Sequence, residues 1–387
     1  MSLDGRPPLP LAEIAGYFLR LGTLGFGGPI ALAGYMQRDL VERLGWITQE
    51  EYLEGLAVSQ TLPGPLAAQL AMWLGYVRRG FPGAVAAAVP FILPPFVIVS
   101  VVAALYVAFA GSTIIQALFY GIGPAVIALI LRGAWKLVRV TVKNDRRLWV
   151  IFGAIAAITF VVRSEVAILF VVSGLAGVLL YAPPAWLRRV AAARAFVPLG
   201  LGGVITAAQS ADPNVLLTLG IFFFKAGAFT FGSGLAIVPF LQQGVVREYG
   251  WLNEREFLDA VAMGMITPGP VVITAVFVGY LVAGLAGATV AGIGVFLPPF
   301  LMVVVFGPWI MRWRRHPAVQ GFTRGATAAA AGAIVGAAAV IATQVLVDVP
   351  TLAIFVLASV ILWRLKVPEP ALVGASAIAG LLLFGLR

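Results

Sequence analysis

The sequence predicts an all-α integral membrane protein made of two repeats of about six apolar segments each. Of the 387 residues, 61% are hydrophobic and 11% are charged, which excludes an ordinary soluble domain. Apolar runs of 18 residues or more recur along the whole chain, and this is the length that a helix needs to cross a bilayer. Residues 1–10 are polar and proline-rich, so we expect no cleavable signal peptide.

The second observation is a duplication of about 205 residues. Residues 59–65 read SQTLPGP, and residues 264–270, which lie 205 positions later, read GMITPGP. Further matches keep this register: residues 19–28 with 224–233, 45–46 with 250–251, 51–54 with 256–259 and, after one deletion, 94–95 with 298–299. We therefore expect an N-terminal transmembrane repeat at 1–182, a linker at 183–214 and a C-terminal transmembrane repeat at 215–387.

The first repeat opens with an apolar segment at 14–35. Four glycines and a proline fall within residues 22–29, so we expect a broken or unwound helix near the middle of this segment. The Pro-Gly-Pro segment follows, and two long spans come after it. Two shorter segments close the repeat and fall below the usual spanning length. These later segments lie at 53–77, 83–110, 114–137, 148–162 and 166–181.

The Pro-Gly-Pro motifs at 63–65 and 268–270 predict broken or re-entrant helices. Each motif removes two backbone donors and restricts the residue before each proline, so a continuous helix cannot pass through it. Interrupted backbone at membrane depth is tolerated where protein or a water-filled cavity covers it, and paired interruptions are typical of a transporter binding site. If these segments span the membrane, residues 196–209 of the linker must also cross, which gives about thirteen spans. If they re-enter, each repeat has five full spans, and the sequence leaves this choice open.

Loop charges predict that the two repeats are inverted. Positive loops mark the cytoplasmic side of a membrane protein. In the first repeat, Arg78 and Arg79 make one loop basic, the next loop is uncharged, and residues 132–147 are strongly basic. In the second repeat the order reverses, because residues 283–288 are uncharged and 312–315 hold three arginines. We expect equivalent loops on opposite faces of the cell inner membrane, as in many secondary transporters.

The helix breaks are the candidate substrate site. A broken helix exposes free N–H groups and the positive end of its dipole, and glycine allows close approach to them. Arg20 and Lys225 share one repeat position before each first break, and a charge at such depth marks a pathway or a substrate partner by default. Without an acid-rich cage, these groups favour an anion over a metal cation. The candidate residues are Arg20, Thr23, Phe26, Gly27, Gly28, Gln60, Thr61, Pro63, Gly64, Pro65, Lys225, Thr230, Phe231, Gly232, Ser233, Thr267, Pro268, Gly269 and Pro270.

Structural interpretations of the same residues stay open. Pro-Gly-Pro in a membrane helix is often only a kink, and Arg20 or Lys225 could snorkel to an interface. Other repeated glycines, such as Gly75 and Gly279, are more typical of close helix packing than of a site.

Glu54 and Asp259 occupy equivalent positions and are the candidates for proton coupling. The alternative is that they face a solvated loop or cap the following helix. No Gly-rich Lys-Ser/Thr motif is present, so we expect an ion gradient or a partner to supply the energy. The chain has no cysteine and one histidine, and it shows no catalytic or metal-binding constellation, so we expect neither an enzyme nor a cofactor. The net charge of +10 indicates orientation and does not predict nucleic-acid binding.

The motifs Phe26-Gly27-Gly28, Gly45-Trp46 and Pro63-Gly64-Pro65, with the stretch around Glu51 and the duplication at about 205 residues, resemble the chromate ion transporter superfamily in its long two-domain form. The resemblance covers the chain from about residue 17 to 386. It implies a permease that extrudes chromate with the proton-motive force and confers chromate resistance. Chromate is a tetrahedral dianion like sulfate, which agrees with the anion site.

The second copy departs from the first, because Ser233 replaces Gly28 and Lys225 replaces Arg20, so we do not expect the halves to be equivalent. The expected function is proton-coupled chromate export across the bilayer, with one repeat rocking against the other. A permease for sulfate or another oxyanion and a passive anion channel remain alternatives, and a membrane enzyme is disfavoured. A homodimer is common among such proteins, but no residue pattern shows an interface.

Overall fold

The structure is a computed structural model, which describes residues 9–109, 112–162, 167–183, 214–230, 234–313, 316–365 and 367–386. Within these ranges the chain is helical and contains no strand, which confirms the all-α class. Four continuous helical stretches are long and apolar enough to cross a membrane: 66–108, 113–141, 271–313 and 317–345. Most of the expected linker, including residues 196–209, lies outside the described residues.

The described residues of the first half form seven α-helices. They are α1 (Leu11–Leu24), α2 (Gly28–Met36), which continues as a π-helical segment at Gln37–Arg43, α3 (Gln49–Thr61), α4 (Leu66–Ala108), α5 (Thr113–Thr141), α6 (Arg146–Val162) and α7 (Ala167–Tyr181). The first segment is broken between α1 and α2, as predicted.

The second half repeats these elements. They are α9 (Val215–Phe229), α10 (Ile237–Leu241) between a short turn at Gly234–Ala236 and a π-helical segment at Gln242–Glu248, α11 (Glu254–Ile266), a turn at Val271–Ile273, α12 (Thr274–Leu301), a π-helical segment at Met302–Phe306, α13 (Gly307–Trp313), α14 (Pro317–Val345), α15 (Val349–Arg364), α16 (Glu369–Leu383) and a last turn at Phe384–Leu386. Both α3 and α11 have 13 residues and start 205 positions apart.

Local sequence explains why α3 and α11 begin where they do. The Thr48 hydroxyl accepts a hydrogen bond from the Glu51 N–H, and the Glu51 carboxylate accepts one from the Thr48 N–H. Asn253 and Glu256 form the same reciprocal capping box at the start of α11. Glu51 and Glu256 therefore have structural roles at the two helix N-termini.

The long helices α4 and α12 each bend sharply near their first third. The bends lie at Arg79-Gly80 and at Ala283-Gly284, where the φ angles of the glycines are 61° and 59°. The limbs on either side pack closely, since a Cβ on Gly75 would lie 2.2 Å from the Gly83 carbonyl oxygen. A Cβ on Gly279 would lie 2.4 Å from the Gly287 carbonyl oxygen. Gly75 and Gly279 therefore allow close packing of the two limbs, as the sequence predicts for these repeated glycines.

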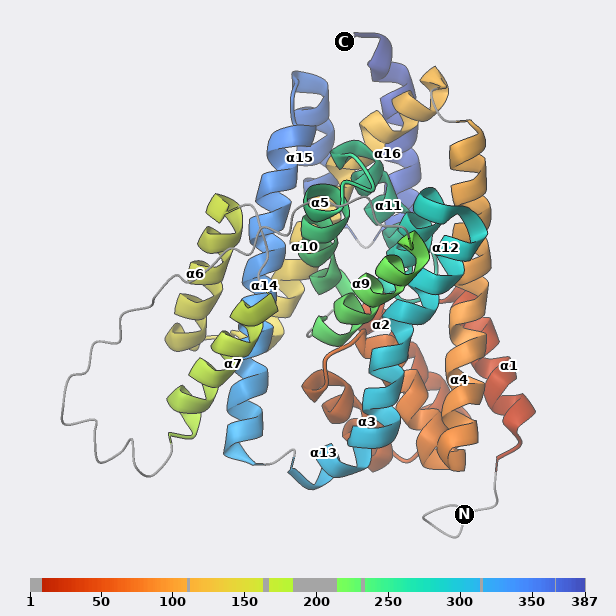
Figure 1. The fold of residues 1–387 in the computed structure, drawn as a ribbon, viewed down its shortest axis with the longest axis vertical. Coiled ribbons are helices and arrows are strands. Elements are labelled where there is room, and N and C mark those ends of the chain that lie inside the picture. The colour runs from red at the N-terminus through yellow and green to blue at the C-terminus, as the bar shows by residue number, and fades with distance from the viewer. Residues whose placement is uncertain are drawn as a thin grey trace, which may run out of the picture.

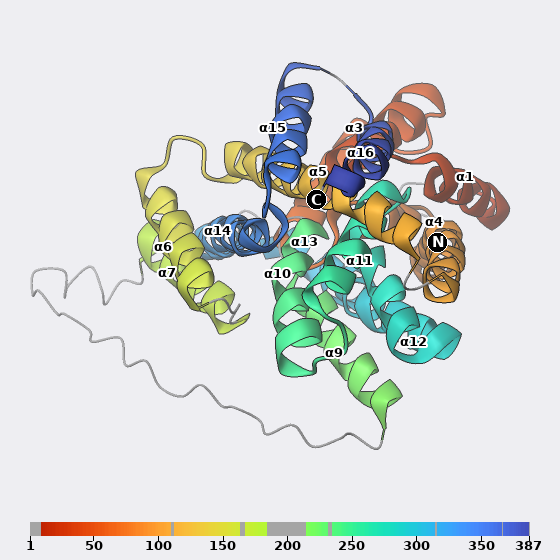
Figure 2. The ribbon, with the colours of Figure 1, turned by 90° about the horizontal axis from the view of Figure 1, so that it is seen from above.

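The two halves exchange their last helix pairs. Helices α6 and α7 pack against α14 of the second half, and α15 and α16 pack against α5 of the first half. Helices α5 and α14 also pack against each other, as do α4 and α12 (Figure 2). In Figure 1, α5 runs downward from the upper end of the molecule while α14 runs upward, so these equivalent helices are antiparallel. An inverted repeat requires this arrangement.

The exchanged packing predicts a position-specific effect on stability within α16. Gly380 is buried, and a Cβ there would lie 2.3 Å from the Ala117 carbonyl oxygen of α5. We expect Gly380→Val to lower the stability of the detergent-purified protein by about 1–3 kcal/mol, because the two backbones cannot separate without losing their packing. Thermal unfolding followed by tryptophan fluorescence measures this loss.

The matched control is Gly374→Val on the same helix, where no heavy atom lies within 4 Å of the added Cβ. Equal losses in the two variants would contradict the packing of α16 against α5.

Candidate functional site

The two Pro-Gly-Pro breaks meet the opposite halves of the molecule. The Gly64 N–H donates a hydrogen bond to the Thr230 carbonyl oxygen, and the Gly269 N–H donates one to the Gly25 carbonyl oxygen at 2.9 Å. Gly64 and Gly269 are equivalent in the duplication, and so are Gly25 and Thr230. The same interaction is thus made twice. The glycine at each Pro-Gly-Pro break, Gly64 or Gly269, is here called the tip, and each tip hydrogen-bonds to the first helix break of the other half.

Each tip is also seated against the paired prolines of the other half. An added Cβ on Gly64 would lie 2.7 Å from Cβ of Pro299, and one on Gly269 would lie 3.0 Å from Cγ of Pro95. The φ angles of Gly64 and Gly269 are 142° and 96°, a region that favours glycine. Within the first half, the Gln69 side-chain amide donates to the Pro63 carbonyl oxygen at 2.8 Å and braces the tip.

Several expected hydrogen-bond donors are already in use. The amides of Gly64 and Gly269 bond across the halves, so in this conformation they do not offer their N–H groups to an anion. Four threonine hydroxyls bond back to carbonyl oxygens four residues earlier in their own helices, as threonine commonly does in helices. They are Thr23 to Leu19, Thr61 to Ala57, Thr230 to Ala226 and Thr267 to Met263.

A cavity of about 660 Å³, here called the central cavity, lies between the two halves. Gly27 and Gly28 at the first break line it, and so does Gln60 next to the first Pro-Gly-Pro motif. Met265 and Val271 flank the second motif and also contribute. The cavity therefore brings three predicted residues together with elements of the second half. Phe231, Gly232 and Ser233 lie outside the described residues.

Charged side chains give this cavity a positive lining. The basic residues are Arg132 and Lys136 of α5, Lys143 after α5 and Arg324 of α14, while the acidic ones are Asp145 and Glu369. Arg132 and Lys136 stand four residues apart, one helical turn, and both reach the cavity. Four cations against two carboxylates favour an anionic ligand.

Sequence reasoning missed Arg132 and Lys136 as site residues, because it used the basic stretch 132–147 only to assign orientation, although both residues fall near the end of the predicted segment 114–137. Helix α5 extends that segment to Thr141 and places both residues on a helix. The signal that could have found them is their i, i+4 spacing near the end of an apolar helix. The equivalent positions of α14 are Gly336 and Val340, so this cationic pair belongs to the first half alone.

Asp145 is held at the edge of the cavity. It lies in the turn between α5 and α6, where it accepts a hydrogen bond from the Tyr181 hydroxyl and another from the Arg147 N–H. These bonds, the one from Tyr181 above all, keep the pKa of Asp145 below its usual value. Arg324 lies over the ring of the same tyrosine, 5.3 Å from its centroid.

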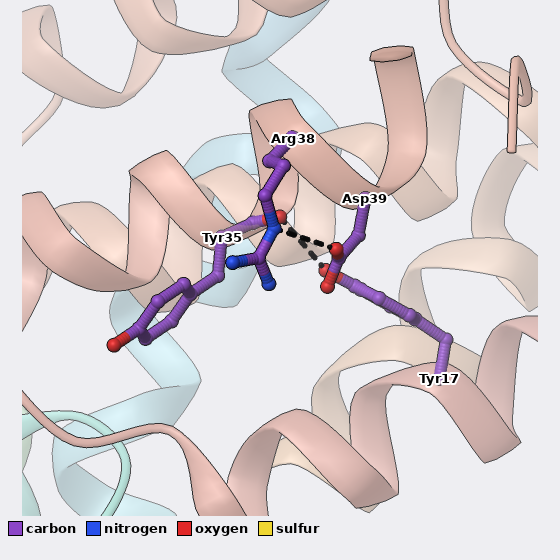
Figure 3. A network of polar contacts seen from close by, with 4 residues as sticks. All are labelled: Tyr17, Tyr35, Arg38 and Asp39. Carbon is purple, nitrogen blue, oxygen red and sulfur yellow. Dashed lines mark hydrogen bonds and ion pairs between the residues drawn. The ribbon is translucent and has the colours of Figure 1, made fainter. Parts of the chain in front are cut away.

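Arg20 lies in a second, smaller hollow of about 170 Å³, here called the arginine pocket. Its charged lining residues are Arg20, Arg38, Arg43 and Asp39. Figure 3 shows Arg38 beside Asp39, with Nε 3.0 Å from Oδ1, and its guanidinium lies 5.4 Å from the ring centroid of Tyr35. The Tyr17 hydroxyl points toward the Tyr35 carbonyl oxygen (Figure 3). Arg20 therefore lines a different hollow from the central cavity, and the exposed Lys225 lines neither hollow.

The two candidate coupling carboxylates have different surroundings. Asp259 is 4% exposed, and its Oδ2 accepts a hydrogen bond of 2.7 Å from the Tyr106 hydroxyl of α4. Glu54, at the equivalent position of α3, is only half-buried. Neither of them lines the central cavity or the arginine pocket.

The place equivalent to the central cavity is filled by packing in the second half. Helix α11 lies against α5 and α16, and the Arg255 side chain donates to the Gln116 carbonyl oxygen at 3.1 Å. Tyr120 of α5 donates to Asp348 at the start of α15, with a distance of 2.7 Å. The two halves thus share a fold but differ in openness at equivalent places.

The tip contacts predict that Gly64 tolerates substitution less well than another glycine with positive φ. An alanine Cβ at Gly64 would lie 2.5 Å from Nε2 of Gln69 and 2.7 Å from Cβ of Pro299. Gly45 has a φ of 62° but no neighbour within 4 Å. We expect Gly45→Ala to cost only the left-handed strain of about 1–2 kcal/mol. Gly64→Ala should lower the stability further, as thermal unfolding in detergent would measure, and an equal loss would contradict the role of the tip contact.

Comparisons with known proteins agree on one family. Its sequence profile, described as "Chromate transporter", matches residues 12–178 and again residues 217–381. The chromate transport protein of Cupriavidus metallidurans is 49% identical over 386 residues, covering 100% of this chain and 96% of that protein. The probable chromate transport protein of Synechococcus elongatus is 46% identical, covering 98% and 97%, and the chromate transport protein of Pseudomonas aeruginosa is 31% identical, covering 98% and 94%. No solved structure matches.

Proposed function

The chain belongs to the chromate transporter family, and from this premise we propose that it exports chromate across the cell inner membrane, driven by the proton-motive force. Export in this direction confers chromate resistance, because it lowers the cytoplasmic concentration of the oxyanion. The central cavity is the observation that carries the proposal.

The lining of this cavity suits a tetrahedral dianion. Arg132 offers a planar guanidinium that can bind two oxygens of an oxyanion at once, and Lys136 adds a compact charge one turn away. Gly27 and Gly28 leave the backbone open to close approach from the opposite wall. A volume of about 660 Å³ admits the ion together with several water molecules. We assign chromate to the space between this cationic pair and the first helix break.

Alternating access follows from the difference between the halves. The central cavity is open beside α3, while α11 closes the equivalent place against α5 and α16. In the alternate conformation, α3 closes on α14 and α11 withdraws from α5. The Pro-Gly-Pro tips are the pivot of this motion, because each is anchored to the opposite half.

Arg20 and Lys225 act at the two ends of this path. Arg20 contributes to the arginine pocket, whose three arginines attract the dianion to a second place outside the central cavity. Lys225 holds the equivalent position on α9, and it attracts the dianion in the alternate conformation.

Sulfate is the main competing substrate, and one observation favours it. Chromate and sulfate share their charge and tetrahedral shape, and the cavity's cations recognise these two properties alone. Competition between the two ions in the assay below distinguishes a chromate exporter from a general oxyanion permease, and uptake that ignores the proton gradient identifies a passive channel.

Chromate uptake into everted membrane vesicles tests the proposal. With an imposed proton gradient, the wild-type protein should accumulate chromate, and Arg132→Gln or Lys136→Gln should lower kcat/KM about tenfold, the effect of removing one charge from a partly buried anion site. Arg20→Gln and Lys225→Gln should each lower uptake as well. Arg146→Gln carries the same charge change outside both hollows and is the control. Uptake of sulfate without chromate would overturn the proposed substrate.

Proton coupling is assigned to Asp259 and Glu54. Asn at Asp259 keeps a hydrogen-bonding partner for Tyr106 but cannot carry a proton, so we expect Asp259→Asn to abolish the acceleration of uptake by the gradient while chromate–chromate exchange continues. Tyr106→Phe removes the hydrogen bond to Asp259 but leaves the carboxyl able to carry a proton, so this variant shows the effect of losing the hydrogen bond alone. Proteoliposomes with an internal pH dye would measure proton movement directly. Full gradient dependence in the Asp259→Asn/Glu54→Gln double variant would exclude both carboxyls as the coupling groups.

A further inference from the structure

Glu369 stands beside the cationic pair of the central cavity but comes from the other half of the molecule. It is the first residue of α16 and follows Pro368 at the helix N-terminus. Arg132 and Lys136 belong to α5 of the first half. A carboxylate at a helix N-terminus is favourable through the helix dipole alone, so its position in α16 by itself assigns no role in transport.

The packing of α5 against α16 explains why these charges meet. Gly121 and Gly380 touch, since a Cβ on Gly121 would lie 2.7 Å from Cα of Gly380, and the two helices run in opposite directions (Figure 1). Arg132 lies 11 residues after Gly121, and Glu369 lies 11 residues before Gly380. Eleven residues make about three helical turns, which brings both side chains to one level and one interface. The glycine contact therefore fixes the register of the charges.

The carboxylate is close to the cations without pairing with them. Glu369 is half-buried in the wall of the central cavity, which Lys136 and Arg132 also line. Among the described residues, no ion pair within 4 Å joins it to either cation. The other charged groups of the cavity are Lys143, Arg324 and Asp145, of which the two cations are exposed to solvent. Glu369 is thus the carboxylate that acts on the buried part of the site.

We propose that Glu369 is a tethered counter-ion, which partly neutralises Arg132 and Lys136 when the cavity holds no oxyanion. The inference rests on the proposed function, in which this pair binds a dianion. The three side chains sum to one positive charge when the site is empty and to one negative charge when a dianion is bound. Without Glu369, the empty site carries two positive charges and the loaded site none.

This charge balance matters because an empty carrier must also change its conformation. A cationic pair without its counter-ion stabilises the loaded form and makes the empty return costly, since the pair is moved through a low-dielectric interior. Glu369 therefore weakens substrate binding and speeds the empty return. Exchange of one oxyanion for another needs no empty return, so it does not depend on this residue.

Glu369→Gln separates these effects. In purified protein at a slightly alkaline pH, the Kd for chromate should fall about tenfold, because one like charge leaves the anion site. In proteoliposomes, net efflux should fall about tenfold while chromate–chromate exchange stays near the wild-type rate. Glu369→Asp should restore net efflux in part, and Glu13→Gln, outside both hollows, should change neither quantity.

A second variant distinguishes a counter-ion from a helix cap. Lys136→Gln in the Glu369→Gln background returns the empty site to one positive charge, so net efflux should rise above that of Glu369→Gln alone. A role confined to the start of α16 predicts no such rescue. An unchanged or weaker affinity in Glu369→Gln, an equal fall of exchange and net efflux, or the absence of rescue would each overturn the inference.

The same variants separate this inference from the proposed substrate. If the wild-type protein neither binds nor moves chromate, the chromate assignment fails, and the series is repeated with sulfate. Tighter sulfate binding and selective loss of net efflux in Glu369→Gln would then sustain the counter-ion, whereas sulfate results that match the wild type would reject it.

Discussion

The structure depends on one interaction made twice, in which the N–H of a Pro-Gly-Pro glycine binds a carbonyl oxygen at the first helix break of the other half. A broken helix leaves backbone groups unpaired, and at membrane depth no bulk water can satisfy them. The N–H groups of Gly64 and Gly269 donate hydrogen bonds to the carbonyl oxygens of Thr230 and Gly25, and Pro299 and Pro95 lie against the two glycines. Each half therefore supplies a hydrogen-bond donor to the first helix break of the other half. The same contacts place the breaks at the centre, where the cavity lies.

Symmetry of the backbone coexists with asymmetry of the side chains. Helices α5 and α14 match in length and position, yet Arg132 and Lys136 correspond to Gly336 and Val340. In the proposed transport cycle, the duplication supplies two interchangeable arrangements of the scaffold, and the unequal side chains let an anion interact with one of them more strongly. A ligand can shift a conformational equilibrium only through such a difference in affinity.

The sequence predicts well those features of the fold that depend on residues close together in the chain. The all-α class, the breaks at 25–27 and at both Pro-Gly-Pro motifs, and the close packing at Gly75 and Gly279 follow from apolar length and from the chemistry of proline and glycine. The sequence predicts less of the site, because contacts between the halves decide it. The amides of Gly64 and Gly269 donate to the other half, Arg20 lines the arginine pocket instead of the central cavity, and Glu369 reaches the cavity only through the packing of α16 on α5.

The chemistry of the cavity bears on selectivity as well as on affinity. Four threonine hydroxyls near the breaks are bonded to their own helices, and none of these threonines lines the central cavity. In the proposed site, Arg132 and Lys136 respond to the charge of a bound ion and to the spacing of its oxygens. Such a site separates dianions from monoanions more sharply than it separates one tetrahedral dianion from another. A carrier also has to release its cargo, and in the proposed site the carboxylate of Glu369 beside the cationic pair weakens the hold on a bound dianion.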